Sequence, residues 1–270
     1  MVFHFYLGLF IIAISEILLF LEFHFVKVFF TPLAWTGYLF LIDGVDYRLS
    51  SSSFIMNRRR EFLLMLPLSA AFWYVFEFFN LFLKNWAYEG LPSFGITLIG
   101  MTWSFSTIGP ALIETENLII SLGCFRGKQE KITIPRTFLY FLILLGVISL
   151  SLIILTPPGI AGYLGVLLWL GFFFIFDPIN YLKGNRSVLR DREILIPLFL
   201  SGLICGFFWE FWNFWAEARW VYTLPYSFGP RIFEMPIFGY LGFPLLAMEF
   251  FSFYSIIFGW KGGRDADNYC

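Results

Sequence analysis

Charged residues are scarce in this chain: they make up 14% of its 270 residues, and the formal net charge is −1. Soluble domains carry roughly 25% charged residues. In contrast, 59% of this sequence is hydrophobic and its mean hydropathy is +0.76. The near-zero net charge offers no broad basic surface of the kind that binds nucleic acid. These values exclude an ordinary soluble domain and predict an integral membrane protein whose first partner is the lipid bilayer.

Cysteine and histidine are also rare, with three and two copies. Cys124, Cys205 and Cys270 show neither the spacing of a zinc site nor that of a disulfide framework. His4 and His24 lie at opposite ends of the first hydrophobic run, so they cannot share a ligand. The sequence contains no phosphate-binding glycine loop, HExxH or GxSxG motif. No cofactor is indicated, and the first residues lack the basic region of a signal peptide.

Eight hydrophobic segments approach or exceed the ~20 residues that a helix needs to cross a bilayer. The segments are, roughly, 3–26, 28–46, 61–83, 95–122, 136–156, 160–182, 193–216 and 234–260. With the N-terminus inside, 14 of the 18 lysines and arginines fall on the cytoplasmic side. The positive-inside rule therefore predicts that both termini are cytoplasmic. We expect a bacterial cytoplasmic membrane.

The chain carries the same pattern twice. Residues 76–80 read FEFFN and residues 209–213 read WEFWN, while WAY at 86–88 matches WVY at 220–222. Further upstream, the first copy has Trp35, Gly37, Asp43 and Tyr47, and the second has Trp169, Gly171, Asp177 and Tyr181, at an offset of 134. An even number of helices per copy gives both copies one orientation. The predicted fold is all-α, with two parallel four-helix repeats at 1–135 and 136–270 in one membrane domain.

Glu77 and Glu210 lie inside predicted spans, where an ionisable group is costly and is a functional hypothesis by default. Asn80 and Asn213 follow three residues later, on the same helix face. We expect these four residues, with the neighbouring Trp209 and Trp212, to line a cavity in which the carboxyl groups supply protons and the other side chains contact the substrate. The alternative is that each glutamate only forms a hydrogen bond across helices and determines their packing.

Asp43 and Asp177 begin a D-x-x-[D/N]-Y pattern at the ends of two predicted spans, each followed by a basic loop. A carboxylate near a helix C-terminus opposes the helix dipole, so it requires a compensating partner. We expect a lysine or arginine of the loop, or a metal such as Mg²⁺ bound together with a phosphate. We place both residues among the substrate-binding candidates and assign no metal ligand; the alternative is a simple interfacial anchor.

Glu114 and Glu249 are further catalytic candidates inside spans that contain Pro110 and Pro244. Removal from water favours the protonated form of a carboxyl group, which suits a general acid. The prolines are expected to bend both helices and to leave carbonyl groups that need partners.

The stretch WVYTLPYSFGPRIFEMP at 220–236 resembles the Y-Y-T…L-G-P-x-x-x-G-V-P region of carotenoid hydratases. The paired helical halves with proline and acidic residues are loosely similar to membrane lycopene cyclases, although Pro110 precedes Glu114 by four residues and Pro244 precedes Glu249 by five. As a whole, the chain looks like a bacterial polytopic membrane protein family. The resemblance implies acid catalysis on a polyene by carboxyl groups embedded in the membrane.

The leading hypothesis is an intramembrane acidic and aromatic site for an apolar substrate, an isoprenoid or another lipid. A proton-coupled transporter or lipid flippase fits the acidic spans as well. The sequence is also compatible with a Mg²⁺-dependent phospholipid enzyme that uses Asp43 and Asp177, and with an assembly factor without catalysis. The substrate and the oligomeric state stay open at this point.

Overall fold

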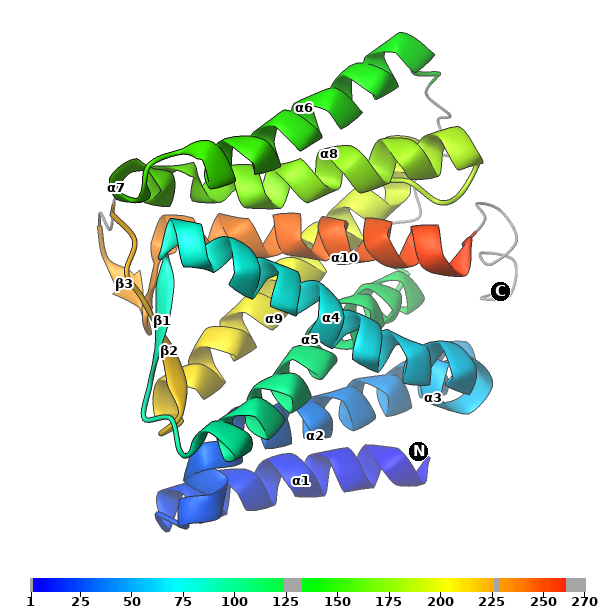
Figure 1. Ribbon diagram of the computed structural model, residues 1–270. Coiled ribbons are helices and arrows are strands. Elements are labelled where there is room, and N and C mark those ends of the chain that lie inside the picture. The colour runs from blue at the N-terminus through cyan, green and yellow to red at the C-terminus, as the bar shows by residue number, and fades with distance from the viewer. Residues whose placement is uncertain (1, 124–132, 226–228, 261–270) are drawn as a thin grey trace.

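A computed structural model describes residues 2–123, 133–225 and 229–260 (Figure 1). Within these ranges, eight helical segments are long and apolar enough to cross a membrane, which confirms the predicted all-α membrane architecture. The spans are α1 (Phe3–Phe20), α2 (His24–Ser50), α4 (Arg59–Leu83), α5 (Phe94–Ser121), α6 (Arg136–Leu155), α7 with η1 and α8 (Pro158–Ala161, Gly162–Leu164, Gly165–Lys183), η2 with α9 (Arg192–Ile194, Leu195–Trp215), and η3 with α10 (Ile237–Leu241, Gly242–Phe258).

The shorter elements lie between the spans. The helix α3 (Phe54–Asn57) connects α2 with α4, and the strands are β1 (Trp86–Glu89), β2 (Arg219–Tyr222), β3 (Arg231–Ile232) and β4 (Met235–Pro236). The first turn lies earlier than expected, since α1 ends at Phe20 and Glu22 adopts a left-handed conformation with φ 57°. As a result α2 begins at His24, and it carries a kink at Phe29, just before Pro32.

The strands β1 and β2 pair with each other in antiparallel fashion, although they are about 130 residues apart in the chain (Figure 1). Trp86 lies opposite Tyr222, and Tyr88 lies opposite Trp220. Because side chains alternate along a strand, these four aromatic residues share one face of the two-stranded sheet. The sequence pattern did not predict strands here, because two four-residue segments are too short to show a clear period of two.

Similar contacts join α1 to α2 and α6 to α8. In each pair a glycine of one helix lies against the backbone of the other. A Cβ atom at Gly8 would lie 2.5 Å from the carbonyl oxygen of Gly37, and one at Gly146 would lie 2.6 Å from that of Gly171. Small residues let membrane helices approach closely in this way. The first and fifth spans, which match poorly in sequence, therefore make the same kind of contact.

The core of the bundle is formed by α5 and α10. The helices α2 and α4 pack on α5, the helices α8 and α9 pack on α10, and α5 also packs on α9. The helix ends separate the described basic residues into two groups. Nine lie at the end that holds α3 and the start of α1, whereas Lys27, Lys84, Arg219 and Arg231 lie at the opposite end, beside the strands.

Candidate functional site

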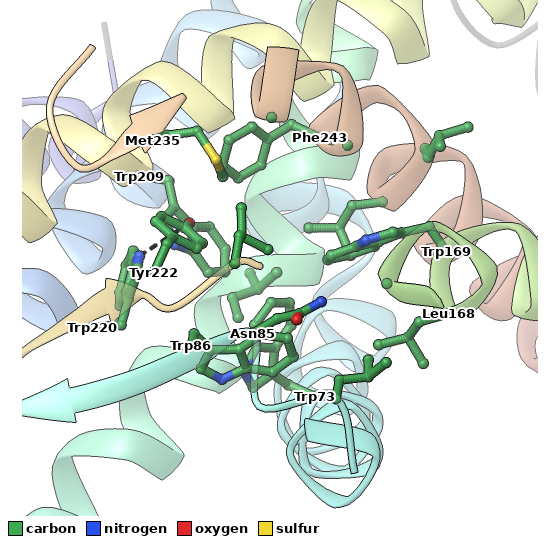
Figure 2. Close-up of a pocket in the computed structure, with 18 of the residues that line it drawn as sticks. Trp73, Asn85, Trp86, Leu168, Trp169, Trp209, Trp220, Tyr222, Met235 and Phe243 are labelled. Carbon is green, nitrogen blue, oxygen red and sulfur yellow. Dashed lines mark hydrogen bonds between the residues drawn. The ribbon is translucent and has the colours of Figure 1, made fainter. Parts of the chain in front are cut away.

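A cavity of about 450 Å³ lies at the strand end, between helices of the first and second halves (Figure 2). This volume falls within the ~300–1,000 Å³ range of small-molecule sites. Its wall is largely apolar and rich in aromatic residues, and it includes six tryptophans: Trp35, Trp73, Trp86, Trp169, Trp209 and Trp220. None of the described residues in this wall is charged.

The mouth of the cavity has an apolar rim. Phe238 and Leu241 of η3 and Val166 of α8 belong to the wall, and they are 77%, 55% and 48% exposed. They lie on spans that are apolar enough to cross a membrane, so the surface around this mouth is suited to contact with lipid rather than with water. An apolar molecule could therefore pass from the bilayer into the cavity without crossing a polar surface.

Glu77 lies one layer behind the cavity wall. Its Oε1 atom accepts a hydrogen bond from the hydroxyl of Tyr88 at 2.5 Å and from the indole nitrogens of Trp73 and Trp86, both at 3.1 Å. These three donors belong to residues that line the cavity. The carboxyl group of Glu77 therefore orients the polar atoms of the wall instead of lining the cavity itself.

Glu210 occupies the corresponding place in the second half. The hydroxyl of Tyr222 donates to its Oε1 at 2.6 Å, and the indole nitrogen of Trp220 donates to the Tyr222 hydroxyl at 3.2 Å. Glu210 is fully buried, and its Oε2 has no hydrogen-bond partner among the described residues. The pKa of Tyr88 and that of Tyr222 lie well above the usual value for a phenol. The main cause is burial, and the second is the carboxyl group of the adjacent Glu77 or Glu210. Both phenols therefore remain protonated at neutral pH.

Asn80 and Asn213 attach the strands to the helices. The amide nitrogen of Asn80 donates to the carbonyl of Trp86 at 2.8 Å, and that of Asn213 donates to the carbonyl of Trp220 at 2.8 Å. Their amide oxygens accept backbone N–H groups at the start of each strand, from Asn85 at 2.9 Å and from Trp220 at 2.9 Å. The side chains that we assigned to substrate binding thus hold β1 and β2 in place over the cavity.

The two predicted tryptophans differ in position. Trp209 lines the cavity, where its ring lies 5.2 Å from those of Trp73 and Trp220. Trp212 packs behind it, 5.0 Å from the ring of Trp35, and donates to Glu16 of α1 at 3.3 Å. Of the ten predicted site residues, Trp209 is the one that the described wall includes.

Asp43 and Asp177 lie at the opposite end of the bundle from the cavity. Asp43 accepts the Ser53 hydroxyl at 2.9 Å and the Ile55 N–H at 2.8 Å. Asp177 makes the corresponding contacts: it accepts hydrogen bonds from the Ser187 hydroxyl at 2.7 Å and the Leu189 N–H at 3.0 Å. Ser187 and Leu189 lie 134 positions after Ser53 and Ile55.

The expected compensating partners of these two aspartates were a basic side chain of the loop or a metal. In the structure, serine hydroxyls and backbone N–H groups donate to both aspartates and hold the connection that follows each helix. For Asp43 the His4 Nε2 atom adds a contact at 2.8 Å. Within the described parts of the chain, no three His, Cys, Asp or Glu residues are placed to hold a metal ion.

Glu114 and Glu249 are fully buried and do not line the cavity. Glu114 lies near Asp43 and Asp46, toward the end of the bundle that carries most of the described basic residues. Neither oxygen of Glu249 has a hydrogen-bond partner in the described structure. The fold thus brings the Glu77 and Glu210 positions together at the sheet and leaves Glu114 and Glu249 elsewhere in the bundle.

Sequence reasoning missed the residues that carry the site, Tyr88 and Tyr222. The available signal was the W-x-Y spacing in both copies, which puts two rings on one face of a strand. No protein-family model matches this chain, and neither a curated protein nor a solved structure does. The functional interpretation therefore depends on the geometry of the cavity and its wall.

The role of Asn213 can be tested with two substitutions. We expect Asn213→Ala to lower the free energy of unfolding by about 1–3 kcal/mol, because the N–H of Trp220 loses its acceptor. Asn213→Asp keeps an acceptor oxygen and should cost less. Thermal unfolding in detergent measures both. If Asn213→Ala unfolds like the wild type but no longer retains bound lipid, Asn213 is a substrate ligand and the anchoring role is wrong.

Proposed function

We propose that this protein binds an apolar lipid, of the isoprenoid class or a similar long-chain class, in the aromatic cavity between its two halves. The observation that supports this most strongly is the wall itself, with six tryptophans, no charged side chain among the described residues, and an apolar rim at the mouth. Indole rings offer large rigid apolar surfaces for a ligand that brings few polar groups of its own. The two glutamates behind the wall keep its donors in place.

We infer further that the two halves are parallel repeats related by an axis along the membrane normal, with both termini in the cytoplasm. The pairing of β1 with β2 supports the axis, because Trp86 opposite Tyr222 and Tyr88 opposite Trp220 are exchanged by the 134-residue offset. Such self-complementary pairing is what a two-fold axis produces. The excess of basic residues at the end that holds α3 supports the orientation.

The orientation is tested by labelling single cysteines in a chain whose native cysteines are replaced by alanine. Glu89→Cys lies at the strand end and Arg59→Cys at the basic end, and both positions are exposed. In intact cells, an impermeant maleimide should label the cysteine at position 89, whereas position 59 should react only after lysis. The reverse result would place the termini outside.

Ligand binding is tested by filling the cavity. Gly242 belongs to the wall, and a Cβ atom there would meet no atom within 4 Å, so Gly242→Trp should occupy the space without disturbing the fold. Gly95→Trp is the matched control, since Gly95 is equally open, also begins a helix at the strand end and does not line the cavity.

We expect wild type and Gly95→Trp to retain an apolar lipid through purification, and Gly242→Trp to lose at least about nine-tenths of it, which corresponds to ~1.4 kcal/mol of binding free energy or more. Mass spectrometry of an organic extract, normalised to protein, measures the amount. Equal lipid content in all three proteins would show that the cavity is not the binding site.

A second candidate function is acid chemistry on a polyene, and the two Tyr–Glu pairs favour it. Tyr222 faces the cavity and Glu210 lies behind it at 2.6 Å. The Tyr222 hydroxyl would transfer its proton to an alkene carbon while a protonated Glu210 returns a proton to the phenol oxygen. The resulting carbocation would lie near the face of Trp209, a favourable cation–π contact. The carbon that gained the proton then loses its other hydrogen as a proton to the Tyr222 oxygen, while the phenol passes its own proton to the Glu210 carboxylate. This restores the double bond, the phenol and the protonated Glu210.

This candidate predicts hydrogen exchange into the substrate. A linear carotenoid incubated with the protein in D₂O should gain deuterium at a vinylic position, detected by mass spectrometry. Glu210→Gln and Tyr222→Phe should each slow the gain by about 10²-fold or more. Glu217→Gln, at a partly exposed carboxyl group of the same end, serves as the control. Undiminished exchange in Glu210→Gln would exclude this route and leave binding as the function.

A further inference from the structure

Apart from the aromatic side chains, the polar side chains of the cavity wall come from one half of the chain. Thr31, Asn85 and Ser104 line the cavity, and all belong to the first half. The residues 134 positions later are Gly165, Arg219 and Phe238. Gly165 and Phe238 also line the cavity but offer no polar side chain, and Arg219 is not part of this wall. In contrast, the aromatic frame is kept in both halves, as in Trp35 and Trp169.

The hydroxyl of Thr31 has no hydrogen-bond partner in the described structure, although the residue is 6% exposed. A helical threonine usually donates to the carbonyl four residues earlier. Here the carbonyl of Lys27 accepts the N–H of Glu217 at 3.0 Å, and the helix is kinked at Phe29. The local carbonyl thus already accepts one hydrogen bond, and the Thr31 hydroxyl makes none to it. A different staggered χ1 rotamer would redirect the hydroxyl, so it can turn toward the cavity that Thr31 borders.

Ser104 is the second available hydroxyl. It lines the cavity, and its side chain makes no hydrogen bond within the described residues. Thr31 and Ser104 also both border a smaller space of about 50 Å³ beside the main cavity, which places them at the same part of the wall. The hydroxyls of Tyr88 and Tyr222, in contrast, are already engaged by Glu77 and Glu210.

We propose that the bound lipid carries one neutral hydroxyl at its end, and that Thr31 and Ser104 bind this hydroxyl while the apolar chain lies along the tryptophans toward Phe238. This inference rests on the proposed lipid-binding function and names the ligand class as a long-chain or isoprenoid alcohol. The wall of the main cavity has no charged side chain among the described residues, which disfavours an anionic headgroup, since a buried charge needs a partner. Arg219 borders the smaller space, but it is already paired with Glu89 at 3.6 Å and Glu234 at 3.4 Å. A pure hydrocarbon would leave the hydroxyl of Thr31 without a partner.

The experiment compares two brominated probes that quench tryptophan fluorescence, a dibrominated long-chain alcohol and the matched dibrominated alkane. The wall tryptophans report binding of either probe to the protein in lipid nanodiscs. We expect the wild type to bind the alcohol roughly tenfold more tightly than the alkane, as one buried neutral hydrogen bond allows. Thr31→Val, which keeps the shape of the side chain, should abolish this preference, and Ser104→Ala should reduce it.

Thr107→Val is the matched control, because Thr107 is buried in α5, its hydroxyl donates to the carbonyl of Ser104 at 2.7 Å, and its side chain does not line the cavity. It should keep the tenfold preference. If alcohol and alkane bind equally well to the wild type, or Thr31→Val keeps the preference, the inference is wrong while lipid binding stands. If neither probe quenches the wild type beyond the level seen with Gly242→Trp, both the inference and the proposed function fail.

Discussion

The pairing of β1 with β2 is the constraint on which the rest of the site depends. Two segments from distant parts of the chain exchange backbone hydrogen bonds, and in doing so they present four aromatic side chains on one face. Asn80 and Asn213 bind the strands to the helices that precede them. Glu77 and Glu210 accept the hydroxyls of Tyr88 and Tyr222 and so orient these rings. At the edge of an apolar medium, each of these polar groups needs a partner within the protein. The two-stranded sheet and the ends of α4 and α9 provide hydrogen-bond partners for one another.

The same logic explains why buried carboxyl groups in this protein have different roles. Glu77 and Glu210 accept hydrogen bonds from side chains of the wall, whereas Asp43 and Asp177 accept them from the connection that follows their own helix. Glu249 has no such acceptor role in the described structure. A carboxyl group inside a bilayer is therefore not by itself a sign of catalysis. The groups that donate hydrogen bonds to the carboxyl group indicate its role: it can orient side chains of the cavity wall, hold the connection after its helix, or lack a partner within the described structure.

The two halves differ in their buried carboxyl groups at the end opposite the cavity. The first half carries Asp46, Glu114 and Glu116, all 0–1% exposed. The residues 134 positions later are Asn180, Met248 and Phe250, which are neutral. Glu116 has an arginine within 3.7 Å, Arg186 of the second half. The first half therefore concentrates buried carboxyl groups, one of which meets an arginine of the other half, while Asp43 and Asp177 make matching contacts.

Hydrophobic length, basic-residue placement and the 134-residue pattern were sufficient to predict the class of fold and its eight spans, because a bilayer imposes length and polarity on every segment that crosses it. The same pattern indicated that Glu77 and Glu210 belong together. Only the tertiary structure decided that their carboxyl groups face the side chains of Tyr88 and Tyr222 and that the cavity wall is rich in aromatic residues and uncharged where described. The direction of a side chain depends on the packing of helices distant in sequence. Composition and periodicity identify the helix but not its neighbours.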